Sequence, residues 1–123
     1  MLRCFGLDAA WSDRNPSALC VLDASGTVLD ETRPVADGEI LDSILSRLRG
    51  PAVVAADLPL RVAVPTGMRP CDREAMRAYG SRAAGPHPTN RSLLIGRDGR
   101  IRGEQLAAEL EAHGFGGPWA SGA

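Results

Sequence analysis

Short apolar runs separated by turn residues dominate the first third of the chain. Residues 3–8, 18–22 and 27–31 each alternate or cluster apolar side chains over five or six positions, and Ala24-Ser25-Gly26 separates the last two runs. Runs of this length with small polar residues between them are typical of β-strands joined by tight turns. We therefore predict a meander of three antiparallel strands.

The next segment changes its period from strand to helix. Apolar residues recur at helical spacing from Ile40 to Leu48, so we predict a helix over residues 38–49 with Asp37 as its cap and Gly50-Pro51 as its stop. Residues 52–57 then form a continuous apolar run, which favours a strand buried on both faces. A helix between two strands implies a crossover, and hence a parallel partner for this fourth strand.

The second half is less regular. We predict a loop rich in proline and glycine after residue 58, a helix from Pro70 to about Tyr79 with Gly80 as its stop, a small hairpin over residues 93–101, and a last helix over residues 104–113. Residues 116–123 show no periodicity and are expected to form a flexible tail after a single domain over residues 1–115. The order strand, strand, strand, helix, strand, helix is that of the ribonuclease-H-like α/β architecture, in which the first and fourth strands are neighbours.

Two of the predicted strands end in an aspartate, Asp8 and Asp57. If the strands are parallel neighbours about 4.8 Å apart, both carboxylates emerge at the sheet edge where open α/β sheets bind ligands. Two such charges repel by roughly 3 kcal/mol at an effective dielectric constant near 20. One must then be protonated, or arginine must pair with them, or a cation must bind. We interpret the pair as the core of a site for Mg²⁺ or Mn²⁺, because oxygen ligands suit these ions.

Charge is distributed unevenly along the chain. Its net charge is −1, yet residues 61–102 contain nine arginines and three acidic residues, and all fourteen basic residues are arginine. Arginine suits bidentate phosphate contacts, and a basic segment attracts polyanions, so nucleic acid or another phosphodiester is the expected partner. With no apolar stretch of membrane-spanning length, no signal-peptide pattern and an odd number of cysteines, we expect a cytoplasmic protein that does not enter the membrane.

Three segments carry a family resemblance. They are Gly6-Leu7-Asp8-Ala9-Ala10-Trp11, Ala55-Ala56-Asp57-Leu58-Pro59-Leu60 and Arg69-Pro70-Cys71-Asp72-Arg73-Glu74-Ala75-Met76-Arg77. In this order they resemble the signature of a family of predicted ribonuclease-H-like nucleases, domain-of-unknown-function family 429. The resemblance implies an α/β fold and a metal-dependent phosphodiesterase. It also implies a further strand and a helix bearing a third carboxylate, so we expect the fold to be incomplete at its C-terminal end.

The third segment places several charges at a predicted helix start. Arg73 and Arg77 lie four residues apart on one face, where like charges repel, and Arg73 is close to the positive end of the helix dipole. Either a substrate phosphate binds both together with Arg69, or Asp57 and Asp72 neutralise them internally. Asp72 is a candidate catalytic residue, although an acidic residue in a first helical turn also stabilises the helix.

Two functions fit these patterns. The first is a metal-dependent nuclease in which Asp8 and Asp57 hold the cation, the arginines bind phosphates and Trp11 stacks on a base, although Trp11 could equally be a packing residue. The alternative is a non-catalytic nucleic-acid or nucleotide-binding protein that lacks the third carboxylate. A fourth strand without a fifth beside it would also leave a free sheet edge, through which a homodimer could form.

Overall fold

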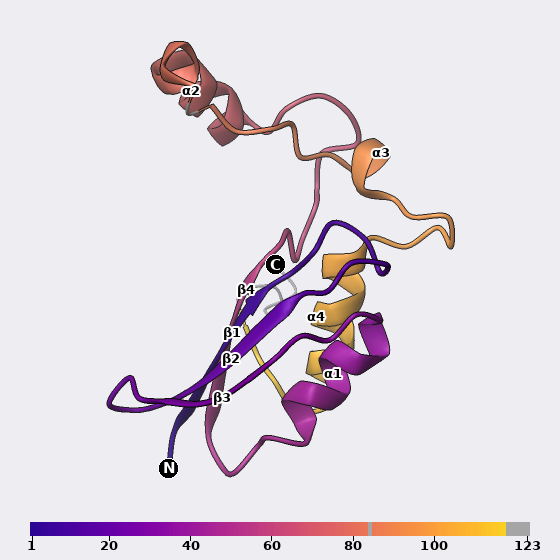
Figure 1. Cartoon of the computed structure of the whole chain (residues 1–123). Helices are drawn as coiled ribbons and strands as arrows, with labels where there is room; N and C mark the ends of the chain where they lie inside the picture. Colours follow the sequence, from indigo (N-terminus) through magenta and orange to yellow (C-terminus); the bar gives the residue numbers. More distant parts are fainter. Residues whose placement is uncertain (84, 118–123) are drawn as a thin grey trace. The chain divides into compact units, whose positions relative to one another are not determined.

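The computed structural model describes residues 1–83 and 85–117 and divides the chain into two compact units. The first unit contains Met1–Leu58 together with Ala112–Phe115, and the second begins at Pro59. The elements of both units are labelled in Figure 1. The predicted tail falls largely outside the description, because residues 118–123 are not among the described residues.

A four-stranded sheet forms the first unit. Its strands are β1 (Arg3–Asp8), β2 (Ala18–Asp23), β3 (Val28–Thr32) and β4 (Ala52–Asp57). They lie in the order β3-β2-β1-β4, with β1 antiparallel to β2 and parallel to β4. The predicted fold class, a meander followed by a helix and a parallel strand beside the first, is confirmed.

One face of this sheet is apolar and buried. Phe5 and Leu7 of β1 alternate with exposed residues and lie opposite Val21 and Leu19 of β2, and all four are at most 3% exposed. Helix α1 (Asp37–Leu45) lies on one side of the sheet and buries Ile40 and Ile44. The period of two in the strands and the helical spacing in α1 therefore build one shared core.

The prediction that residues 52–57 are buried on both faces is wrong. Successive residues of β4 alternate between half-buried and exposed, and the side chain of Val53 is 54% exposed. The cause is topological: within the described residues β4 pairs only with β1, so it is an edge strand. The continuous apolar run also owes much to alanine, which tolerates exposure better than larger apolar residues do. The homodimer predicted through this edge stays a prediction.

Helix α1 also differs from its predicted bounds. It ends at Leu45, four residues before the predicted end, and its first turn follows Ala36, with no capping bond from a side chain at that position. Asp37 therefore does not act as the predicted cap. Instead the carboxylate of Glu39 accepts a hydrogen bond from the Val35 backbone N–H, a reach-back of the capping-box kind.

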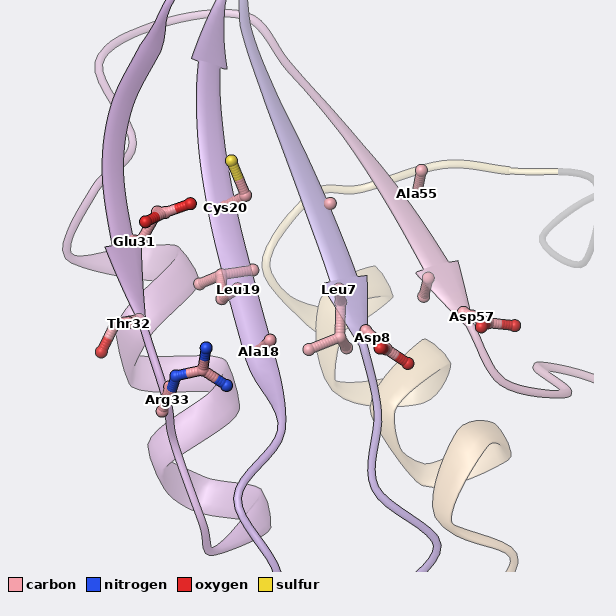
Figure 2. A pocket seen from close by; sticks show the side chains of 12 residues that line it. Leu7, Asp8, Ala18, Leu19, Cys20, Glu31, Thr32, Arg33, Ala55 and Asp57 are labelled. Carbon is pink, nitrogen blue, oxygen red and sulfur yellow. The ribbon is translucent and has the colours of Figure 1, made fainter.

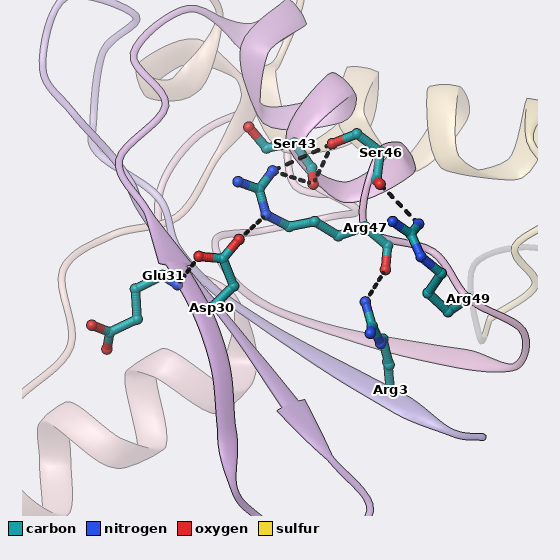
Figure 3. Close-up of polar contacts among 7 residues, drawn as sticks. All are labelled: Arg3, Asp30, Glu31, Ser43, Ser46, Arg47 and Arg49. Carbon is teal, nitrogen blue, oxygen red and sulfur yellow. Dashed lines mark hydrogen bonds and ion pairs between the residues drawn. The ribbon is translucent and has the colours of Figure 1, made fainter.

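Arg47 lies two residues beyond the end of the helix and contacts its last turn. Its guanidinium group donates to the Ser43 carbonyl oxygen and forms a 2.6 Å ion pair with Asp30 of β3, while its own carbonyl oxygen accepts a bond from Arg3. Figure 3 shows this cluster joining α1, β3 and β1. The side chain thus satisfies a carbonyl group in the last turn, as basic residues commonly do at helix ends.

The second unit contains short helices. They are α2 (Pro70–Tyr79), the 3₁₀ helix η1 (Gly80–Arg82), α3 (Arg91–Leu94) and α4 (Arg102–Ala112). Proline at the first position and Gly80 after the last confirm the predicted bounds of α2. The predicted hairpin is reduced to one bridge between Ile95 and Ile101, because residues 91–94 are helical. None of the described helices is long and apolar enough to cross a membrane.

Polar contacts hold the second unit together. Glu104 of α4 accepts hydrogen bonds from the Val62 backbone N–H at 3.1 Å and from Arg91 at 2.7 Å. Asn90, which is 4% exposed, caps α3 through the Leu93 N–H and donates to the Gly67 carbonyl oxygen. These contacts join loop residues that are distant in sequence, which is why the sequence pattern did not indicate them.

Candidate functional site

Asp8 and Asp57 are direct partners in the parallel ladder. Each is the last residue of its strand, the two are paired in register, and both side chains are exposed. Neighbouring strands lie about 4.8 Å apart, so the two carboxylates leave adjacent backbone positions at one edge of the sheet. Among the described residues, neither carboxylate has a hydrogen-bond or ion-pair partner. Two acidic groups therefore stand side by side without internal neutralisation.

Ser17 holds the backbone around this pair, a role that no local sequence pattern indicates. It is 1% exposed, and its hydroxyl oxygen accepts a hydrogen bond from the Ala10 N–H, two residues after Asp8. Its own N–H donates to the Pro34 carbonyl oxygen at 2.8 Å. Ser17 thereby joins the loop after β1 to the start of β2 and to the segment after β3. It acts as a positioning residue for the chain that carries Asp8.

A hollow of about 830 Å³ extends from the two aspartates over one face of the sheet. Its lining residues all belong to the first unit and come from all four strands and the segment after β3. Small residues form much of this face: Gly6, Ala18, Cys20 and Ala55. Figure 2 shows Asp8 and Asp57 at the ends of β1 and β4, with Glu31 and Arg33 on the β3 side. The sequence analysis identified the aspartates but missed Glu31 and Arg33.

Trp11 follows the first aspartate by three residues and is 83% exposed. An indole with this exposure contributes little to a core, so the structure gives no support to the packing interpretation. The ring lies in the loop that Ser17 tethers through Ala10. It is available to stack on a flat ligand, although its role as a substrate contact stays a prediction.

The predicted residues on α2 belong to the second unit and are mostly paired there. Arg69 holds the carboxylate of Asp72 through two hydrogen bonds of 2.6 and 2.8 Å, and the Asp72 side chain is only 7% exposed. Arg77 pairs with Glu74 at 2.7 Å on the surface. Arg73 is exposed and has no side-chain partner among the described residues. Asp72 and Glu74 thus neutralise two of the three arginines, Arg69 and Arg77 respectively.

The Arg69 contact lowers the pKa of Asp72 below its ordinary value, because the charged carboxylate accepts both guanidinium hydrogen bonds. A depressed pKa means that the pair stabilises the folded unit above the unfolded pKa, near 4, and that this stabilisation is lost as the pH falls through the folded value. We expect Asp72→Asn to lower the urea midpoint of unfolding at pH 7 and to have a much smaller effect at pH 3. Glu74→Gln, which removes an exposed pair, should change neither midpoint, and an equal loss at both pH values for Asp72→Asn would contradict the argument.

The donor set at the sheet edge suits a hard divalent cation. Mg²⁺ is commonly held by one or two carboxylates, with waters and substrate phosphates completing an octahedral shell. Asp8 and Asp57 supply two carboxylates in register that no other described residue pairs with, and Mn²⁺ accepts the same ligands. Within the part of the chain that the structure describes, no group of three or more His, Cys, Asp or Glu side chains is placed to hold a metal ion. The pair therefore fits a site that substrate oxygens complete.

The sheet order, the parallel pairing of β1 with β4 and the crossover helix define a mixed α/β fold consistent with a ribonuclease-H-like core. A comparison with protein families matches residues 6–116 to the family described as Protein of unknown function (DUF429). The chain belongs to this family. No curated protein and no solved structure gives a significant match to it.

Proposed function

We propose that the chain is a metal-dependent phosphodiesterase that acts on nucleic acid. The observation that carries the proposal is the pairing of Asp8 with Asp57, in register at the ends of neighbouring parallel strands and without partners among the described residues. Like charges held this close destabilise a fold unless a ligand compensates them. A pair of exposed carboxylates at this edge of an α/β sheet is therefore typical of a ligand-binding site.

The two aspartates would act together in this proposal. Asp57 on the edge strand β4 and Asp8 on the inner strand β1 would both hold the cation. A bound divalent ion would polarise the scissile phosphate and lower the pKa of the attacking water. The chain itself positions the phosphate: the small residues of the sheet face leave room for it, and Trp11 stacks on a neighbouring base.

One arginine of the second unit, Arg73, has a phosphate-binding role in this proposal. Arg73 is the one of the three predicted arginines that has no partner among the described residues, so its guanidinium group is available for a backbone phosphate. Asp72 has a structural role here, because Arg69 holds it at the start of α2. We therefore assign no chemical step to Asp72.

A second function has its own support. The exposed indole of Trp11 could bind a base, and the guanidinium group of Arg33, which has no partner among the described residues, could bind a phosphate, both without any cation. These two groups favour a non-catalytic nucleic-acid-binding or nucleotide-binding protein as the alternative. The two functions differ in whether a bound strand is cut.

Metal titration separates them. We expect purified protein to cleave a fluorescently labelled single-stranded oligonucleotide only when Mn²⁺ or Mg²⁺ is added, with no cleavage in EDTA and binding without cleavage in Ca²⁺. Binding without turnover under every cation condition would establish the alternative. If the protein neither binds nor cleaves DNA or RNA, both functions are contradicted.

A further inference from the structure

Arg33 continues a row of residues that begins at the two aspartates. Asp57 lies opposite Asp8, and Asp8 lies opposite Ala18. The β2–β3 ladder pairs Leu19 with Thr32, and the Ser17 N–H bonds the Pro34 carbonyl oxygen, so the register between these pairs places Arg33 opposite Ala18. The row Asp57, Asp8, Ala18, Arg33 therefore crosses the whole sheet.

The backbone at Arg33 is well defined. Pro34 follows it and is buried, and a residue before proline is restricted to extended conformations. The Ser17 N–H donates a 2.8 Å hydrogen bond to the Pro34 carbonyl oxygen, and this bond holds the segment as a continuation of β3. The Arg33 side chain is exposed, lines the hollow and has no hydrogen-bond or ion-pair partner among the described residues. A positive charge is thus presented at the opposite end of the hollow from the carboxylates (Figure 2).

The sheet surface between these two ends carries small side chains. Ala18 is the only residue between Asp8 and Arg33 in the row, and Gly6 and Cys20 follow in the next row. A methyl group added at Gly6 would meet no atom within 4 Å, which shows how open the surface is above this position. Two strand spacings, about 10 Å, separate the backbone of Asp8 from that of Arg33. A ligand that reaches both Arg33 and a cation held by the aspartates must be extended and suits both ends best when it carries an anion at each.

We propose that Arg33 binds a second phosphate of a single-stranded oligonucleotide that lies across the sheet, perpendicular to the strands, with the phosphate to be cleaved at Asp8 and Asp57. This inference rests on the proposed nuclease function and defines its substrate as a strand of at least two phosphates rather than a small phosphodiester. Arg33 is then a specificity residue, because it contacts the substrate away from the reacting phosphate.

Glu31 sets the path of the strand. It lies opposite Cys20, two ladder positions away from the row and on the same face, and lines the same hollow. Its carboxylate repels a phosphate placed deeper on the sheet face, so the strand follows the row that leads to Arg33. Removing the Arg33 charge should therefore weaken the affinity for an oligonucleotide, and removing the Glu31 charge should strengthen it.

The test compares two substrates. Bis(p-nitrophenyl) phosphate has one phosphate, whereas a 5′-phosphorylated tetranucleotide has several. We expect Arg33→Gln to raise KM for the tetranucleotide about tenfold, as the loss of a charge-assisted contact would, and to leave kcat and the rate on bis(p-nitrophenyl) phosphate unchanged. Arg33→Lys should recover part of the loss. Glu31→Gln should lower KM for the tetranucleotide a few-fold.

Binding measurements keep this inference distinct from the proposed hydrolysis. Fluorescence anisotropy of the labelled tetranucleotide in Ca²⁺ needs no turnover, and Arg33→Gln should weaken it about tenfold there too. Arg33-dependent binding by a protein that never cleaves would overturn the hydrolase and support the contact. Unchanged tetranucleotide binding in Arg33→Gln, equal losses on both substrates, or no tetranucleotide binding by the wild type would overturn the Arg33 contact.

Discussion

Asp8→Asn is expected to reduce kcat/KM for Mn²⁺-dependent oligonucleotide cleavage by about a thousandfold, equivalent to about 4 kcal/mol of transition-state stabilisation. Asparagine preserves the size of the side chain and one oxygen ligand but removes the negative charge. With Asp57 alone, the site offers half its charge to a divalent ion. The loss should appear in kcat as well as in the Mn²⁺ concentration required for half-maximal rate.

The control for this variant is Asp13→Asn, which changes the same charge in the exposed loop after β1 and should retain full activity. Stability gives a second control with the opposite sign. Asp8 and Asp57 repel each other by up to roughly 3 kcal/mol at 5 Å and an effective dielectric constant of 20, an upper limit for exposed groups. Asp8→Asn should thus unfold at the same or a higher temperature than the wild type in EDTA. Retention of a tenth of the wild-type activity would contradict an essential role for the Asp8 charge in holding the cation.

The sequence predicted the elements that have a strong local period. Alternation in residues 3–8 and 18–22 defined two strands, and the helix between residues 31 and 52 implied a parallel partner for β4. The ribonuclease-H-like order of elements then identified β1 as that partner, which placed Asp8 and Asp57 at the same edge. This inference succeeded because element order and crossover direction are topological properties that the local periods reveal.

Other parts of the site depend on contacts that have no local pattern. Ser17 is important because its hydroxyl group meets Ala10 and its N–H meets Pro34, which are seven and seventeen residues away. Arg33 precedes a proline directly after a strand, a signal of extended backbone that was present in the sequence and went unused. Beyond the end of α1, Arg47 pairs with Asp30 of β3, a partner that periodicity does not reveal.

Ile44→Ala is expected to remove a large part of the stability of the first unit. Ile44 is fully buried, and it belongs to the helix that carries the chain from β3 to β4. Truncating a buried isoleucine to alanine removes apolar contacts and leaves a cavity, at a cost of about 3–4 kcal/mol. A unit of some 60 residues has a free energy of unfolding of only a few kcal/mol. Urea unfolding followed by circular dichroism should show most of its stability lost.

The loss of stability in Ile44→Ala should also disturb the site, because α1 is the crossover that keeps β4 parallel to β1 and Asp57 in register with Asp8. In the destabilised variant, a cation that binds only the folded unit should restore stability by mass action, so Mn²⁺ at a hundred times its dissociation constant should recover about 2.7 kcal/mol. The double variant Ile44→Ala/Asp8→Asn should show no such recovery. Val28→Ala, at a position 54% exposed, is the matched truncation without a cavity and should cost well under 1 kcal/mol. Equal effects of the two truncations would show that α1 does not pack as described.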